Sequence, residues 1–536
     1  MTLSRKSLVF SRLNILRIVT ITAVFVLILV SLPSFAQDPT GANTGTINDV
    51  TAATAGKPTM QEIGAQAGHN KIAINIMWTL IAGFLVMFMQ AGFAMVETGF
   101  TRRKNVAHTM AMNFLVYALG ILGFWICGFA FMFGGAGSIS ALGGTPGLTH
   151  EATITLFGKP FDFIGSAGYF LNSSVYDVGI FTLFLFQMVF MDTTATIPTG
   201  SMAERWKFKS FVVYGLFISM FVYPIFGNWV WGGGWLADLG INFHLGHGHV
   251  DFAGSSVVHM VGGVAALAGA VVIGPRIGKY GKNGEVKTIP GHNIPMAIIG
   301  TFILAFGWFG FNPGSTLAGT DLRIAVVAVN TMLASASGAF AAMLYMWLKY
   351  KKPDPAMIAN GMLAGLVAIT APCAFVNATS SIIIGAVAGL LVIFAALFID
   401  RKLKIDDPVG AVAVHGVNGF WGILSLGLFA DGSYGDGWNG VAGTVKGLFY
   451  GDSGQFFAEL IGGIACFAFV YPVMWGFFRI CKATIGLRVD AKDEVDGLDI
   501  PEMGVEGYVD VDERPEIIIL EPSTNGHPKP SVPVGV

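Results

Sequence analysis

Charged side chains are scarce in this chain of 536 residues. Asp, Glu, Lys and Arg make up 12% of the sequence and hydrophobic residues 54%, whereas charged residues make up about 25% of a soluble globular domain. This balance excludes an ordinary soluble protein. It predicts an all-α membrane protein that crosses the bilayer many times, and the 71 glycines fit the close packing of helices in lipid.

Cysteine is also scarce, and the sequence shows no metal-ligand spacing or cofactor motif. The four cysteines lie in or next to apolar segments: Cys127, Cys373, Cys466 and Cys481. We expect packing residues rather than a disulfide framework. Because the ionisable residues show no pairing of a nucleophile with a base, we expect no enzyme, no cofactor and no metal. The net charge of −2 says nothing about partners, and we expect no nucleic acid among them.

Residues 1–36 have the pattern of a signal peptide. A basic start is followed by an apolar stretch over residues 18–32, and Ser34-Phe35-Ala36 fits a small-x-small cleavage site. The alternative is a retained first helix. We expect residues 37–72 to form an extracytoplasmic segment that is polar and loosely ordered up to about Asn70.

Apolar stretches of the length that a membrane helix needs, about 20 residues, recur within residues 73–480. We predict a transporter domain of eleven transmembrane helices in this part of the chain. Their approximate ranges are 73–99, 107–135, 176–202, 208–230, 252–274, 291–312, 323–348, 355–376, 379–399, 408–430 and 456–479.

Basic residues mark every second loop between these helices. Lys and Arg gather after each odd-numbered helix, for example at residues 102–104, whereas the intervening loops hold only Lys159, Arg323 and Lys446. The positive-inside rule then places the mature N-terminus outside and the C-terminus inside. A cleaved signal peptide delivers the same arrangement. We expect a multi-pass protein of the cytoplasmic (inner) membrane.

Two stretches share the pattern D-x-x-G-x-x-x-x-H, from Asp251 to His259 and from Asp407 to His415. Each histidine lies eight residues, about 12 Å, into its helix, so the two approach the middle of the bilayer from opposite sides. An ionisable residue inside a membrane helix marks a functional site by default. The pairing predicts an inverted repeat of helices 1–5 against helices 6–10, with the eleventh helix added.

Further motifs resemble, in order, those of the ammonium transporter family, the bacterial Amt branch of the Amt/Mep/Rh superfamily. The resemblance covers roughly residues 73–508. It rests on Met89-Gln-Ala-Gly-Phe-Ala-Met-Val-Glu97, Arg103-Lys-Asn105, Phe186-Gln-Met-Val-Phe190, Ala203-Glu-Arg205, Trp231-Gly-Gly-Gly234, residues 251–259, Gly307-Trp-Phe-Gly-Phe-Asn-Pro-Gly-Ser315, Ile369-Thr-Ala-Pro-Cys373 and His415-Gly-Val-Asn-Gly419.

The resemblance implies a homotrimer in which each protomer has its own narrow, apolar pore for ammonium. It implies an outer recruitment site of three rings, one hydroxyl acceptor and one acid: Trp231, Phe186, Phe190, Ser315 and Asp251. Phe190 and Phe311 correspond to the two stacked rings that gate the pore below this site. Cation–π attraction to aromatic faces stabilises a desolvated cation by on the order of 2 kcal/mol, which offsets part of the hydration energy that the cation loses.

His259 and His415 correspond to the paired pore histidines of the family. A neutral imidazole both donates and accepts, so two in line can bind ammonia and pass a proton along. The alternative is a structural pair. Two roles stay open for Asp251, direct action on the cation and capping of its helix, and we favour capping. We interpret Asp407 as a cap without a part in the chemistry.

We therefore predict an ammonium transporter that deprotonates the cation near the stacked rings and conducts ammonia past the histidines. The proton crosses separately, which makes transport electrogenic. A passive ammonia channel is the alternative mechanism, and methylammonium is a second substrate to test. An ammonium sensor is the alternative function. We disfavour it because known sensors of this kind carry a signalling domain after the last helix, where about 55 residues follow here.

Three features are left open by the sequence. Asp192, inside the third helix, either pairs with a polar group or lines an aqueous vestibule. The loop with His244, His247 and His249 is typical of a metal-binding tract, but we favour a loose polar loop. We expect Glu97 to pair with a nearby basic residue.

Residues 481–508 resemble the family's cytoplasmic regulatory tail, which packs under the trimer and couples the protomers. The family commonly has a histidine where this chain has Met503. PII-type signal proteins block such transporters from the cytoplasmic side, so the resemblance implies one as a partner. Residues 509–536 are acidic and then rich in proline, and we expect them to be disordered.

Overall fold

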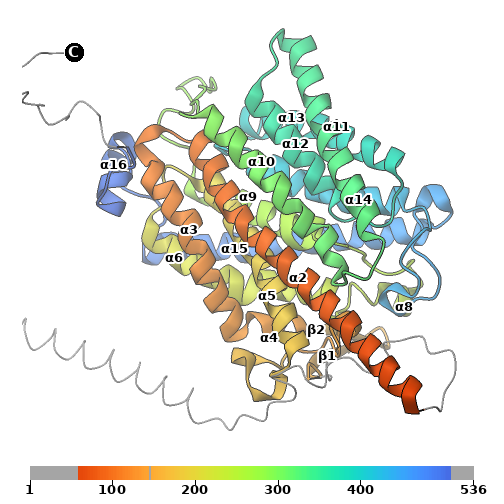
Figure 1. Ribbon diagram of the computed structural model, residues 1–536. Coiled ribbons are helices and arrows are strands. Elements are labelled where there is room, and N and C mark those ends of the chain that lie inside the picture. Colours follow the sequence, from red (N-terminus) through yellow and green to blue (C-terminus); the bar gives the residue numbers. More distant parts are fainter. Residues whose placement is uncertain (1–57, 144–146, 509–536) are drawn as a thin grey trace, which may run out of the picture.

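The computed structural model describes residues 58–143 and 147–508 (Figure 1). The signal peptide predicted for residues 1–36, the segment 37–57 and the extension predicted to be disordered at residues 509–536 lie outside the described residues.

Within the described residues, ten helical segments are long and apolar enough to cross a membrane. In chain order they are formed by α2 (Pro58–Phe100), α3 (Val106–Gly123) with α4 (Phe129–Phe133), α5 (Val178–Met202), α6 (Phe208–Phe217) with α7 (Tyr223–Trp231), α9 (Val261–Ile273), α10 (Ile294–Phe311), α11 (Ile324–Tyr350), α13 (Ala378–Arg401), α14 (Asn418–Phe429) and α15 (Ser453–Thr484). Single π-helical turns (Phe124–Gly128 and Ile218–Val222) join α3 to α4 and α6 to α7.

Shorter elements complete the chain: α8 (Leu239–Phe243), α12 (Pro355–Ile369), α16 (Ala491–Asp496) and the antiparallel strands β1 (Glu151–Leu156) and β2 (Lys159–Gly165). Figure 1 shows the long helices packed as one bundle, with α16 at one end and the hairpin β1–β2 towards the other. We call these ends the tail face (residues 485–508) and the hairpin face (residues 151–165).

Several helices start at an Asp or Asn whose side chain accepts hydrogen bonds from the first turn. These caps are Asp177 for α5, Asn293 for α10, Asp354 for α12, Asn377 for α13 and Asp452 for α15. A cap satisfies N–H groups that have no partner within the helix, which fixes where each membrane segment begins.

The eighth predicted helix is shorter than expected, so the count of eleven stays a prediction. It was expected over residues 355–376, but α12 ends at Ile369 after 15 residues. Pro372 explains the end, because proline lacks the N–H of a helix and disfavours helical backbone before it. The turns that follow are buried, and the N–H of Ala371 donates to Ser255 Oγ at 2.7 Å. Irregular backbone at this depth is tolerated where protein surrounds it.

Two features of the hairpin face differ from what the sequence predicts. The first helix begins at Pro58 rather than near residue 73, because the stretch before Lys71 is rich in residues that extend an existing helix. The hairpin β1–β2 was not predicted at all, and its turn is formed by Phe157 and Gly158, both with positive φ.

Glycines bring the first and sixth predicted helices, α2 and α10, into close contact. A Cβ at Gly300 would lie 2.6 Å from the main-chain oxygen of Gly92, and one at Gly92 would lie 2.8 Å from Leu304 Cγ. Such contacts replace the hydrophobic driving force that is absent between helices in lipid.

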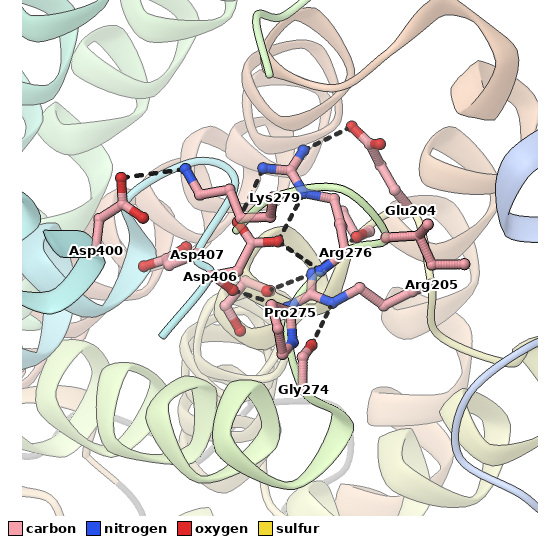
Figure 2. Close-up of polar contacts among 12 residues, drawn as sticks. Glu204, Arg205, Gly274, Pro275, Arg276, Lys279, Asp400, Asp406 and Asp407 are labelled. Atoms are coloured by element: carbon pink, nitrogen blue, oxygen red, sulfur yellow. Dashed lines mark hydrogen bonds and ion pairs between the residues drawn. The ribbon is translucent and has the colours of Figure 1, made fainter. Parts of the chain in front are cut away.

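The loops predicted to be basic meet at the tail face. Arg276 binds both carboxylate oxygens of Asp406, at 2.8 and 3.0 Å, and donates to Glu204 at 3.0 Å (Figure 2). Arg205 donates to the main-chain oxygens of Asp406 (2.7 Å) and Gly274 (3.0 Å). All four charged residues are almost fully buried. The loops after α5 and α9 are thereby joined to the segment that precedes His415.

The tail itself binds main-chain N–H groups in, or directly after, the basic loops that follow α2, α5 and α9. The N–H of Ile277 donates to Glu494 Oε1 (2.6 Å), that of Phe208 to Glu502 Oε2 (2.8 Å) and that of His108 to Asp499 Oδ1 (3.0 Å). These basic loops therefore share one face, as the alternating pattern predicts. Which side of the membrane this face meets stays a prediction.

We expect Asp406→Asn to lower the free energy of unfolding by about 3–5 kcal/mol at pH 7, because it leaves the buried Arg276 guanidinium without its carboxylate. Burial alone would raise the pKa of Asp406, but the hydrogen bonds and charges of Arg276 and Arg205 hold it well below its usual range. Stability from a lowered carboxyl pKa is present above the unfolded value of about 4 and is lost as the pH falls through the folded value.

Thermal unfolding in detergent over a series of pH values measures this effect. The difference in unfolding midpoint between wild type and Asp406→Asn should keep its full size from pH 5 to 8 and should become smaller only below about pH 4. Asp400→Asn is the matched control, because Asp400 pairs with Lys279 at 3.1 Å but is 30% exposed, and pairs of that kind contribute at most about 1 kcal/mol. Equal effects of the two substitutions on the unfolding midpoint would contradict the prediction that the buried Asp406–Arg276 pair stabilises the fold more than the exposed pair.

Candidate functional site

The two D-x-x-G-x-x-x-x-H stretches adopt the same local structure. Asp251 accepts hydrogen bonds from the N–H groups of residues 254–257 at 2.7–3.0 Å. Asp407 accepts from Gly410 (3.1 Å) and Val412 (2.7 Å). Gly254 and Gly410 both have positive φ, 115° and 81°, a conformation that favours glycine. The geometry agrees with the expected role of both acids as caps.

After each cap comes a π-helical turn that carries the histidine, Ser255–Met260 before α9 and Val412–Val417 before α14. Such turns occur frequently at functional sites. The first turn of α9, which directly follows His259, touches the turn that carries His415 through main chain, since a Cβ at Gly263 would overlap the backbone of Gly416. This contact brings His259 and His415 together in the middle of the bundle.

The two imidazoles form a direct pair. Nδ1 of His259 and Nδ1 of His415 are 3.2 Å apart, and the rings are nearly parallel, with centroids 5.2 Å apart and planes at 25°. Since a neutral imidazole has one N–H, one Nδ1 donates and the other accepts. The two Nε2 atoms must then differ, one bare and one protonated. His259 Nε2 is buried and has no partner within the described residues.

Aromatic rings continue this pair towards the hairpin face. Phe311 stacks on His259 (centroids 5.4 Å apart) and Phe190 on Phe311 (4.1 Å, planes at 27°). Phe190 also contacts Phe186 at 4.6 Å and Trp231 at 6.2 Å between centroids. The structure thus brings six predicted site residues into one column: Trp231, Phe186, Phe190, Phe311, His259 and His415.

Asp251 and Ser315 lie beside the column rather than in it. Asp251 is buried, and its main-chain oxygen accepts a 2.6 Å hydrogen bond from Trp231 Nε1. Ser315 lies in the turn Pro313–Thr316 after α10 and donates its hydroxyl to the main-chain oxygen of Phe311 at 2.8 Å. Its oxygen lone pairs stay free to accept.

On the tail side of His415 lies a small cavity of about 20 Å³, which is room for about one water-sized molecule. Phe93, Glu97, Asn360 and Val409 line it together with His415. Glu97 was expected to pair with a basic residue, and this is wrong. Its carboxylate accepts from Asn113 Nδ2 and Thr199 Oγ1, both at 2.7 Å.

Two of the features that the sequence left open are now placed. Asp192 is buried in α5, and its Oδ1 has no partner within the described residues. The segment of His247 and His249 is buried rather than a loose loop, because His247 Nε2 bonds Gly443 O (2.9 Å) and His249 contacts Glu459 (2.7 Å). No cluster of three metal-ligating side chains occurs in the part of the chain that the structure describes.

Two residues of the site escaped the sequence analysis. Trp308 stacks on His259 with centroids 5.3 Å apart, and its indole N–H donates to Thr370 at 3.0 Å. Glu459 is fully buried in α15. A carboxylate within an apolar helix was a signal for a functional residue, but its partner His249 is too distant in sequence to be inferred from spacing.

Comparisons with known proteins agree with this geometry. The model of the Ammonium Transporter Family matches residues 77–508. The chain is 46% identical to ammonium transporter Amt2 of Archaeoglobus fulgidus over 82% of this chain and 89% of that protein. It is 37% identical to ammonium transporter Amt1 of Haloferax mediterranei, over 83% and 82% of the two chains.

Solved structures show the same fold. A structure described as a sensor Amt protein is 36% identical, with a TM-score of 0.69 over 81% of this chain and 99% of that one. Mep2 of Candida albicans is 26% identical, with a TM-score of 0.65 over 78% and 87% of the two chains. With its helical bundle and its column of rings, this multi-pass membrane protein belongs to the ammonium transporter family.

Proposed function

We propose that this chain transports ammonium through the column described above. The supporting observation is the unbroken series of rings from Trp231 through Phe190 and Phe311 to the two histidines. Recruitment takes place at the hairpin face, where Trp231, Phe186 and Phe190 offer ring faces to the cation. Ser315 accepts one N–H of ammonium. Asp251 acts indirectly, by capping its helix and holding the Trp231 indole.

Ammonium leaves its proton at the stacked rings and continues as ammonia. Phe190 and Phe311, 4.1 Å apart between centroids, leave no space between them for a hydrated ion, and removing water from an ion costs several kcal/mol. Neutral ammonia avoids most of that cost, and its size suits the cavity of about 20 Å³ beyond His415. Potassium has no proton to lose, so this step rejects it.

The histidine pair supplies hydrogen bonds where the column is otherwise apolar. Ammonia accepts from the protonated Nε2 and donates to the bare one. The proton released from ammonium crosses separately along hydrogen-bonded groups, so one positive charge moves with each ammonia. Transport is then electrogenic.

The proposal extends to topology and assembly. The matched caps and π-helical turns at Asp251 and Asp407, with the glycine contacts between α2 and α10, support an inverted repeat of helices 1–5 and 6–10. The hairpin face lies outside and the tail face inside an inner membrane. The functional unit is a homotrimer, and a PII-type signal protein binds at the tail face. Methylammonium is a second substrate.

Charge movement in proteoliposomes after an ammonium jump tests the proposal. We expect a saturable current with ammonium and none with potassium. An ammonia flux without current would replace electrogenic transport by a passive channel. Absence of both, with ammonium still bound, would overturn transport. That outcome would favour the second candidate, a sensor, which is supported by the 36% identity to a structure described as a sensor Amt protein.

A further inference from the structure

A buried chain of polar groups leads from α15 to the Trp231 end of the column, and the proposed function does not use it. Glu459 Oε2 lies 2.7 Å from His249 Nδ1, and His249 Nε2 lies 2.9 Å from Ser256 Oγ. The Ser256 hydroxyl donates to Asp251 Oδ2 at 2.7 Å. Glu459, His249 and Ser256 are 0% exposed and Asp251 is 1% exposed.

The hydrogen bonds determine where the protons are. Since Ser256 gives its only proton to Asp251, its oxygen must accept from His249, which places a hydrogen on Nε2. Glu459 Oε1 accepts from the N–H of Val250 (3.0 Å) and from Gln455 Nε2 (2.7 Å), and such donors favour an ionised carboxylate. His249 Nδ1 lies at ion-pair distance from the Glu459 carboxylate, 2.7 Å from Oε2, although neither of these two atoms makes a hydrogen bond of regular geometry.

The charge of His249 is consistent with this assignment. Burial opposes the imidazolium, but the Glu459 carboxylate and, further away, Asp251 raise the pKa of His249 above its ordinary value. Two carboxylates and one imidazolium leave one net negative charge on a group that includes Asp251, whose main-chain oxygen holds the Trp231 indole, and a negative charge favours a cation nearby.

The order Ser–His–Glu matches the geometry of a hydrolytic triad, a pairing that the sequence analysis did not find. A nucleophilic role does not follow here. The Ser256 hydroxyl is fully buried and its proton is directed to Asp251, whereas a triad serine gives its proton to the histidine. These hydrogen bonds hold the Asp251 side chain in place and do not make the Ser256 oxygen a nucleophile.

We propose that Glu459 and His249 are positioning residues for ammonium recruitment. Acting through Ser256, they fix the Asp251 carboxylate, and the main-chain oxygen of Asp251 holds the indole of Trp231 at 2.6 Å. This inference rests on the proposed function, because recruitment at Trp231 is part of it. Without the pair, Ser256 is free to turn away and the Trp231 ring loses its fixed orientation.

The test compares Ser256→Ala and Glu459→Gln with wild type in proteoliposomes, using ammonium as the probe. Both variants should raise the half-saturating ammonium concentration about tenfold, the effect of losing one hydrogen bond to a charged group, and leave the maximal current within about twofold. Glu494→Gln is the matched control, since Glu494 is equally buried and ion-paired but lies at the tail face. Its half-saturating concentration should equal that of wild type.

Two results would overturn the inference. One is an unchanged half-saturating concentration in both variants. The other is a loss of maximal current alone, which a purely structural role would give. If Glu459→Gln does not fold, the half-saturating concentration of Ser256→Ala alone tests the inference. If wild type carries no current, the proposed transport has failed, and calorimetric binding of ammonium to the same variants still tests positioning, with about tenfold weaker binding expected.

Discussion

Replacing His259 and His415 together by alanine is expected to lower the ammonium-driven current about 100-fold. In the proposed mechanism, the two Nε2 positions supply hydrogen bonds to ammonia in an otherwise apolar part of the column. Moving a polar molecule there without a partner costs roughly 1–3 kcal/mol for each lost bond. Two lost bonds amount to about 3 kcal/mol, and each 1.4 kcal/mol is a factor of about ten. The current per reconstituted protein measures this directly.

The chain offers a control of the same residue type. His292 lies at the tail face, where its ring bonds the main-chain oxygen of Thr101 (2.9 Å) and the hydroxyl of Tyr508 (3.1 Å). His292→Ala should leave the current within about twofold of wild type. A double variant at His259 and His415 that keeps a third of the wild-type current would show that the pair is structural.

Asp251→Asn is expected to reduce transport at least about tenfold and to lower the midpoint of thermal unfolding, whereas Asp407→Asn should have a much smaller effect. Asp251 accepts two main-chain N–H groups on each carboxylate oxygen, but Asp407 accepts one on each. An amide has one acceptor oxygen, so it leaves two buried N–H groups unpaired at Asp251 and one at Asp407. Each costs about 1–3 kcal/mol.

The pattern of kinetic change separates the two roles of Asp251. A cap that holds both Trp231 and the start of the His259 turn should, when lost, raise the half-saturating concentration, lower the maximal current and lower the unfolding midpoint together. An acid that only attracts the cation should raise the half-saturating concentration and leave the unfolding midpoint unchanged. The second pattern would contradict the capping role, as would equal losses in Asp251→Asn and Asp407→Asn.

Hydropathy predicted most helix ranges to within a few residues, because the absence of charge in a membrane segment is a strong signal. Hydropathy failed to predict helix ends that are set by the backbone properties of particular residues. At Pro372 the helix ends early, and at Pro58 it starts early because nothing before Lys71 stops it. The hairpin β1–β2 is too short and too exposed for a clear alternating pattern.

The site was predictable where a motif carries its own geometry. The D-x-x-G-x-x-x-x-H pattern contains both the capping acid and the glycine whose positive φ starts the turn, so His259 and His415 could be placed from sequence. Contacts between distant segments could not. Glu459 and His249 are separated by most of the second half of the chain, and Glu97 took neutral partners, Asn113 and Thr199, in place of the basic residues nearest in sequence.

The contact at Gly263 and Gly416 makes the spacing of the two imidazoles a property of the backbone. Side chains around the column can change in size and repack over evolutionary time while the main-chain contact keeps the imidazole nitrogens in place. The reverse does not hold, because a single methyl group added at Gly263 would push α9 away from the turn that carries His415. The column of rings can therefore tolerate sequence drift in most of the side chains around it, but the spacing of its two histidines depends on a glycine that has no side chain.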